Sequence, residues 1–209
     1  MRAGILCLAL AAAGTALAAP LQLVKDGKSA FVIYLDAAVP KSVKLAAEEL
    51  QRVVAVATGA KLPIVNAPAH PMICLGDNKA ARKAGLSSEK MADESFRIVT
   101  KDGNLFIIGK DWPDNDKKWI RCDSTGTLFG VYEFLERVVG VRWLMPGEWG
   151  EDIPAHAGGL TLASMDVTGQ PAVPSRYLSG DLGAMPGVFI DRAEADRWSL
   201  RNRLGSSIA

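Results

Sequence analysis

The feature that most constrains this fold is a short apolar helix joined through one glycine to a strand. Residues 126–136 read Gly-Thr-Leu-Phe-Gly-Val-Tyr-Glu-Phe-Leu-Glu, and residues 141–144 read Val-Arg-Trp-Leu. Apolar side chains recur at helical spacing from the first segment onward: Leu128, Val131, Tyr132, Leu135 and Val138. Gly140 suits the left-handed conformation that ends many helices, and Ser124 or Thr125 is expected to cap the helix start. The pattern predicts a helix whose apolar side packs against a sheet.

A second, longer helix is predicted immediately after Pro40, because proline favours the first turn of a helix. Gly59 marks its expected end. Seven apolar residues share one face of this helix: Val43, Ala46, Ala47, Leu50, Val53, Val54 and Ala57. The opposite face is expected to lie in water and carries Glu48, Glu49, Gln51 and Arg52.

Short β-branched and aromatic segments predict the strands. They cover residues 30–36, 62–65, 72–76, 95–100, 104–109, 141–144 and 160–163. Lys101-Asp102-Gly103 joins two of them in a predicted hairpin, because an Asp-Gly pair favours tight turns. Alternation of apolar and polar residues over 95–100 predicts that one face of this hairpin is solvated. A short helix is expected over residues 77–84.

The order of these elements predicts an α+β fold, with a mixed or antiparallel sheet and two main helices packed on one face. We expect residues 20–168 to form this domain. After Pro171 the sequence becomes a proline-containing linker, and residues 191–204 have the spacing of an amphipathic helix. A lone strand–helix unit cannot bury its own apolar face, so residues 169–209 are expected to open a second domain whose remaining elements lie elsewhere.

Residues 1–18 have the pattern of a secretory signal peptide. Arg2 supplies a positive start, residues 5–13 are apolar, and Ala16-Leu17-Ala18 matches a cleavage site. The apolar run is too short to cross a bilayer, and no later segment is long and apolar enough to do so. The sequence therefore predicts an exported protein, periplasmic or extracellular, without a membrane span.

Charge and metal-ligand spacing exclude several classes of function. The 24 basic and 23 acidic residues give a net charge of +1, so no nucleic-acid partner is expected. Cys74 and Cys122 follow the signal peptide, and either a disulfide or a buried free thiol at Cys74 fits an exported chain. His70 and His156 stand apart from the cysteines and from each other. Residues 111–116 are acidic but lack the glycine and glutamate of a calcium loop, so neither a metal site nor a cofactor is predicted.

Several segments, taken in order, resemble the hexosaminidase-like accessory domain of secreted glycoside hydrolases. The same domain occurs at the N-terminus of bacterial α-glucuronidases and of related uncharacterised secreted proteins. The matching segments are residues 45–51, 57–64, 73–76, 94–98, 107–109, 126–136 and 140–144. The resemblance implies a rigid domain in front of a catalytic (β/α)8 barrel. Residues 169–209 would then hold the first βα unit of that barrel, and the barrel would be the partner of this domain.

The resemblance gives a binding role to one residue. Residues 173–177 are similar to the first barrel strand, in which hexosaminidases carry an arginine that holds sugar hydroxyls. Arg176 is the only position onto which this role can be carried. Residues 179–182 replace the usual continuation of the hexosaminidase pattern, which favours the broader group of relatives.

Two tryptophans and several carboxylates are further candidates. Trp112 and Trp119 share a polar loop and can stack on sugar rings or pack against another domain. Glu133 and Glu136 are expected on a solvated helix face, where Glu133 and Arg137 form an i,i+4 ion pair. The acidic residues that follow the Pro-Gly turn are expected in a surface loop: Glu148, Glu151 and Asp152.

No catalytic residue is predicted. Glycoside hydrolysis needs two carboxyl groups about 5–9.5 Å apart, and barrel enzymes carry their catalytic residues at the ends of several strands. The sequence therefore predicts a non-catalytic N-terminal accessory domain of a secreted glycoside hydrolase-like protein. The alternative is a stand-alone carbohydrate-binding or surface-interaction module. In both cases an oligo- or polysaccharide is the expected ligand.

Overall fold

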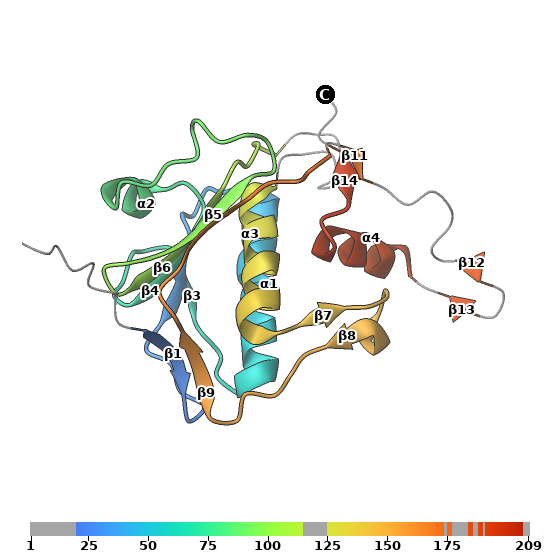
Figure 1. Cartoon of the computed structure of the whole chain (residues 1–209), viewed down its shortest axis with the longest axis horizontal. Helices are drawn as coiled ribbons and strands as arrows, with labels where there is room; N and C mark the ends of the chain where they lie inside the picture. Colours follow the sequence, from blue (N-terminus) through green and yellow to red (C-terminus); the bar gives the residue numbers. More distant parts are fainter. Residues whose placement is uncertain are drawn as a thin grey trace, which may run out of the picture.

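A six-stranded mixed sheet lies at the centre of the computed structural model, which describes residues 20–114, 125–173, 175–176, 184–185, 188–189 and 191–206. The strand order is β10-β5-β6-β4-β2-β3 (Figure 1). The bounds are β2 Val32–Tyr34, β3 Ile64–Val65, β4 Met72–Leu75, β5 Phe96–Lys101, β6 Asn104–Gly109 and β10 Asp166–Gly169. β3, β2, β4 and β6 run parallel, whereas β5 and β10 are antiparallel to their neighbours. The predicted mixed sheet is confirmed, although its edge strand β10 was not predicted.

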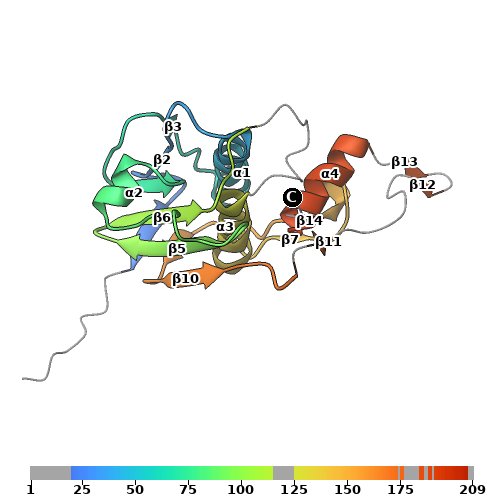
Figure 2. The same cartoon turned by 90° about the horizontal axis from the view of Figure 1, so that it is seen from above.

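Two helices cover one face of this sheet, as predicted (Figures 1 and 2). They are α1 (Lys41–Thr58) and α3 (Gly126–Phe134), and α3 continues as a π-helical turn over Leu135–Val139. Left-handed glycines end both, Gly59 with φ of 77° and Gly140 with φ of 83°. The main core lies between these helices and the sheet, and Ile33, Ile73 and Ile107 point into it from three adjacent strands.

The predicted hairpin forms, and its predicted solvated face is confirmed only in part: Arg97 is half-buried and Lys101 is exposed, but Val99 on the same face is buried. Lys101 pairs with Asn104 across a two-residue turn, in which Asp102 and Gly103 have φ of 50° and 73°. These positive angles are those of a type I′ turn. A second core lies on the opposite side of the sheet and includes Val99 of β5. Its other members come from the neighbouring strands, from the short helix α2 (Lys79–Lys83) and from the segment after it: Tyr34, Met72, Cys74, Ala81, Leu86, Phe106 and Ile108. Because this cluster covers the centre of the second face, Val99 and the whole of β6 are buried.

Two small antiparallel pairs lie outside the central sheet. β1 (Leu21–Lys25), which was not predicted, pairs with β9 (Gly159–Leu162). β7 (Arg142–Trp143) pairs with β8 (Glu151–Asp152), and a 3₁₀ turn over Glu148–Gly150 lies between them. The β7–β8 hairpin places its turn below the C-terminal helix (Figure 1).

The C-terminal unit consists of short strands around one helix. β11 (Ser175–Arg176) pairs with β14 (Gly205–Ser206), β12 (Ala184–Met185) pairs with β13 (Val188–Phe189), and α4 spans Arg192–Arg201. The expectation that this helix lacks partners for its apolar face is wrong, because Leu200 joins the main core and Trp198 packs against it. β11 and β14 are antiparallel, whereas strands of a (β/α)8 barrel run parallel, so no barrel unit is evident in the described residues.

A carboxylate from outside the helix caps α3. Thr125, one of the two predicted capping residues, makes no side-chain capping bond, and Ser124 lies outside the described residues. Instead, Asp111 Oδ1 accepts a hydrogen bond from the Thr127 backbone N–H at 3.0 Å, and its other oxygen accepts one from the Thr127 hydroxyl. Burial raises the pKa of Asp111 to about 7, although the two bonds from Thr127 oppose this rise.

This raised pKa predicts a pH-dependent stability. Between the ordinary carboxyl value of 3.8 and about 7, the unfolded carboxyl ionises while the folded one keeps its proton. The free energy of unfolding is therefore expected to fall as the pH rises through this window and to level off above it. Asp111→Asn is expected to remove this slope, because an amide oxygen still caps α3 without ionising. Carbon-13 titration of the Asp111 carboxyl checks the cause, and a midpoint near 4 would contradict it.

Candidate functional site

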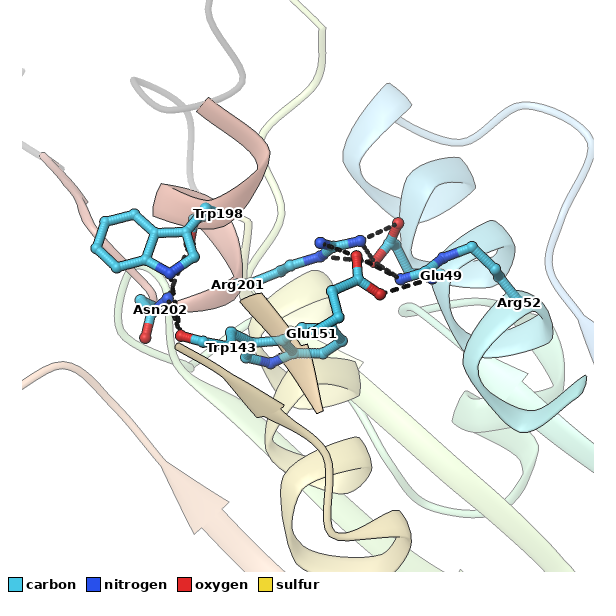
Figure 3. A network of polar contacts seen from close by, with 7 residues as sticks. All are labelled: Glu49, Arg52, Trp143, Glu151, Trp198, Arg201 and Asn202. Carbon is cyan, nitrogen blue, oxygen red and sulfur yellow. Dashed lines mark hydrogen bonds and ion pairs between the residues drawn. The ribbon is translucent and has the colours of Figure 1, made fainter. Parts of the chain in front are cut away.

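An ion-pair network joins α4 to α1 and β8 (Figure 3). Arg201, the last residue of α4, has a side chain that is only 5% exposed. Its Nη2 donates to Glu49 Oε2 at 2.8 Å and its Nε donates to the same oxygen at 3.0 Å, while its Nη1 donates to Glu151. Figure 3 shows the Arg201 guanidinium between these two carboxylates.

Glu49 corrects the interpretation of α1 from its sequence. The sequence pattern predicts a solvated position for this residue, yet it is 4% exposed. Leu50 and Ala46, its neighbours on the helix, belong to the main core, so the buried stripe of α1 is wider than its apolar residues indicate. A buried carboxylate needs a partner, and Arg201 supplies it from 152 positions along the chain.

Arg52 completes the network from the solvent side. Its Nη1 donates to Glu151 Oε2 at 2.8 Å, and its Nη2 lies 3.4 Å from Glu49 Oε2. Burial works to lower the pKa of Arg52, but the two carboxylates outweigh it and the pKa is raised. The charges of two arginines and two glutamates thus balance each other, and both carboxylates are members of structural ion pairs.

Trp143 lies beneath this network and connects it to the rest of α4. The Arg201 guanidinium carbon lies 4.5 Å from the centre of the Trp143 ring, which is a cation–π geometry. The Trp143 carbonyl accepts hydrogen bonds from Trp198 Nε1 at 3.0 Å and from Asn202 Nδ2 at 3.3 Å. Trp143 itself is 5% exposed.

Two further arginines of the C-terminal unit pair with carboxylates of the preceding domain. Arg203 donates to Glu133 and Glu136 of the α3 segment, both at 3.0 Å. These glutamates are therefore half-buried ion-pair partners rather than members of a solvated face, although the predicted Glu133–Arg137 pair also forms. We call Arg176, Arg201 and Arg203 the arginine anchors.

Arg176 is the third anchor, and its partner is Glu94. Its Nη2 lies 3.0 Å and 2.9 Å from the two oxygens of Glu94, which is 2% exposed. Its Nε donates to the carbonyl of Arg203 at 2.8 Å, and its Nη1 donates to that of Val173. Arg176 also borders a hollow of about 270 Å³ beside α3, and the proposed contact with sugar hydroxyls remains a prediction.

The other predicted site residues are dispersed. Trp112 is half-buried, and its Nε1 donates to Asp93 at 3.0 Å, while Trp119 lies outside the described residues. Cys74 is a buried free thiol, and burial raises its pKa to about 11. Its possible partner Cys122 also falls outside the described part of the chain.

A cavity of about 440 Å³ lies between α1, the β7–β8 turn and α4. It is lined by Arg52, Val56, Gly147, Glu148, Glu151, Ile153, Glu194, Arg197 and Arg201. Sequence reasoning identified Glu148 and Glu151 only as loop carboxylates, and it did not connect them with Glu194 or Arg197. No group of three or more acidic, histidine or cysteine side chains in the described residues has the geometry of a metal site. Within the same residues, no helix is both long and apolar enough to cross a membrane.

No protein-family model matches the chain, and no curated protein sequence matches it. Among solved structures, a GH20 β-N-acetylhexosaminidase from Streptomyces coelicolor A3(2) is similar with a TM-score of 0.48 and 18% identity, over 76% of this chain and 25% of that one. A β-hexosaminidase from Streptomyces plicatus has a TM-score of 0.47 and 16% identity, over 76% and 24%. A GH115 4-O-methyl-α-glucuronidase has a TM-score of 0.48 and 19% identity, over 73% and 19%. The chain thus spans about a quarter of the length of the two hexosaminidases.

Proposed function

We propose that residues 20–168 form a non-catalytic accessory domain of an exported carbohydrate-active protein, and that this domain holds a following (β/α)8 barrel in a fixed orientation. The sequence resemblance supports the carbohydrate context. The observation that carries the orienting role is Arg201, which is buried between Glu49 and Glu151 and ties α4 to the domain.

Buried and bidentate ion pairs suit such a role. An arginine fork matches a carboxylate in only a few geometries, and a buried pair tolerates little displacement because separation would leave charges without partners. The three anchors contact three parts of the domain: α1 with β8, the α3 segment, and the turn before β5. Contacts with three different parts of the domain restrain the orientation of the C-terminal unit as well as its position.

The genomic reading frame beyond codon 209 tests the proposed partner. We expect it to continue in frame with alternating strand and helix patterns of barrel length. A stop codon directly after Ala209, with the encoded chain stable and monomeric, would contradict the proposal. The mass of the secreted product tests export, because cleavage after the predicted signal peptide leaves a chain that starts near Ala19 or Pro20.

The absence of catalysis is a separate prediction. Glu49, Glu133, Glu136 and Glu151 are all held in ion pairs with arginines, so their carboxylate oxygens already have partners within the protein. The purified chain is therefore expected to release no phenol from aryl glycosides above the buffer rate. Turnover that disappears in Glu148→Gln or Glu194→Gln would contradict this prediction and would assign chemistry to the cavity.

A further inference from the structure

The cavity between α1, the β7–β8 turn and α4 has the size and position of a ligand site. Its volume of about 440 Å³ lies within the range of roughly 300–1,000 Å³ typical of small-molecule sites. It opens at the seam between the accessory domain and the C-terminal unit, and such seams are preferred places for binding sites. Glu194 reaches from α4 toward the turn, since its Oε2 lies 3.1 Å from the position that a Cβ on Gly147 would take.

Several polar groups of this cavity are available to a ligand. Arg201 and Glu151 are committed to the ion-pair network. The side chains of Glu148, Glu194 and Arg197, however, make no hydrogen bond or ion pair with any residue that the structure describes. The lining therefore offers free acceptors, the carboxylates of Glu148 and Glu194, and a free donor, the guanidinium group of Arg197.

The charges of the lining select among ligand classes. Three arginines and three glutamates line the cavity, and Glu49 lies directly behind Arg201, so the arginine charges are fully balanced by carboxylates. An anionic ligand would gain nothing from such a site. Intermixed donors and acceptors around a hollow of this size instead suit a neutral compound with many hydroxyl groups.

An exposed indole follows Glu148 directly in the chain. Trp149 is 97% exposed and belongs to the same 3₁₀ turn, Glu148–Gly150, that supplies Glu148 to the cavity. Tryptophan is favoured at binding surfaces because its ring faces are apolar while its edge carries a polar N–H group. The flat apolar face of a pyranose ring complements such an indole.

We propose that this cavity binds one sugar residue of a neutral glycan, with Arg197 and Glu194 bonding its hydroxyls and Trp149 packing against a ring face. The inference deepens the proposed carbohydrate context by placing a glycan subsite at the seam between the accessory domain and the C-terminal unit. It does not depend on the arginine anchors fixing a barrel, and its test is independent of any sequence beyond residue 209.

Titration of the purified protein with defined oligosaccharides tests the proposal. Binding is measured by calorimetry and by tryptophan fluorescence. The panel contains neutral gluco-, xylo- and galacto-oligosaccharides, an acidic oligogalacturonide and a cationic chitosan oligosaccharide. At least one neutral member is expected to bind. Arg197→Gln and Glu194→Gln are each expected to weaken it at least about tenfold, because each removes charged hydrogen bonds to the ligand. Both side chains are exposed, so the variants are expected to keep the fold.

Arg192→Gln is the matched control, since Arg192 lies on the same helix but outside the cavity lining. It is expected to leave the affinity unchanged. Three results would overturn the proposal: no binding of any neutral oligosaccharide, tighter binding of the acidic or the cationic member, or an equal loss in all three variants.

Discussion

Replacing Arg201 with alanine is expected to lower the free energy of unfolding by about 3–5 kcal/mol. The substitution leaves Glu49 buried at 4% exposure without its main partner, and it removes the cation–π contact with Trp143. Denaturant unfolding followed by tryptophan fluorescence measures the change. A loss below about 1 kcal/mol would contradict the account, because that value is typical of exposed ion pairs.

Two further variants distinguish the cost of leaving a buried charge without a partner from the cost of losing an ion-pair contact. Arg52 contacts the same two carboxylates, but its side chain is 38% exposed, so Arg52→Ala is expected to cost about 1 kcal/mol or less. The double variant Glu49→Leu with Arg201→Met removes the buried pair completely and leaves Arg52 with Glu151. Its stability is expected to exceed that of Arg201→Ala, since no unpaired charge remains buried.

Gly126→Ala is expected to have an equally large effect, lowering the free energy of unfolding by about 4 kcal/mol or more. A Cβ at this position would lie 2.2 Å from the carbonyl oxygen of Ser95 and 2.5 Å from the backbone nitrogen of Lys110. Both atoms belong to the backbone around the β5–β6 hairpin, so α3 would have to move away from the sheet. Thermal unfolding of the purified variant, or its failure to accumulate in soluble form, measures this effect.

Gly158→Ala is the matched control for this substitution. A Cβ on Gly158 would meet nothing within 4 Å, and the residue has no positive φ, so its stability is expected to stay within about 0.5 kcal/mol of the parent. A Gly126→Ala protein as stable as the Gly158→Ala protein would show that α3 does not approach the hairpin as closely as the structure indicates.

Local signals predicted most of the secondary structure. The long helix after Pro40, the hairpin around Asp102-Gly103 and the helix end at Gly140 all follow from residues that are close in sequence. Turn-forming residues and apolar periodicity involve residues that are close in sequence, so they can be recognised without knowledge of the tertiary fold. The edge strand β10 has only Val167 as a large apolar residue, and its pairing with β5 became evident only in the sheet.

The candidate site depends on contacts that no local pattern reveals. Glu49 looks like a surface residue because its helix neighbours Glu48, Gln51 and Arg52 are polar. Its partner Arg201 lies on a helix that sequence analysis assigned to a separate unit. Ion pairs between distant residues follow from the packing of elements rather than from spacing, so the anchors and the cavity appear only once the C-terminal unit is placed on the preceding domain.

The central claim is that the arginine anchors hold the C-terminal unit in one orientation on the accessory domain. The most direct test is a distance distribution between spin labels on α1 and α4, introduced by Glu48→Cys and Arg192→Cys on exposed helix faces. Cys122 is replaced by serine in this protein, and Cys74 is left in place because burial raises its pKa to about 11 and keeps it unreactive.

Electron–electron double resonance on this labelled protein is expected to give one narrow distance distribution. The distribution is expected to broaden when Arg201 and Arg203 are replaced together by alanine, because the unit then loses two of its three anchors. A broad distribution in the protein with all three anchors intact, or an unchanged narrow one without them, would contradict the claim that these arginines fix the orientation.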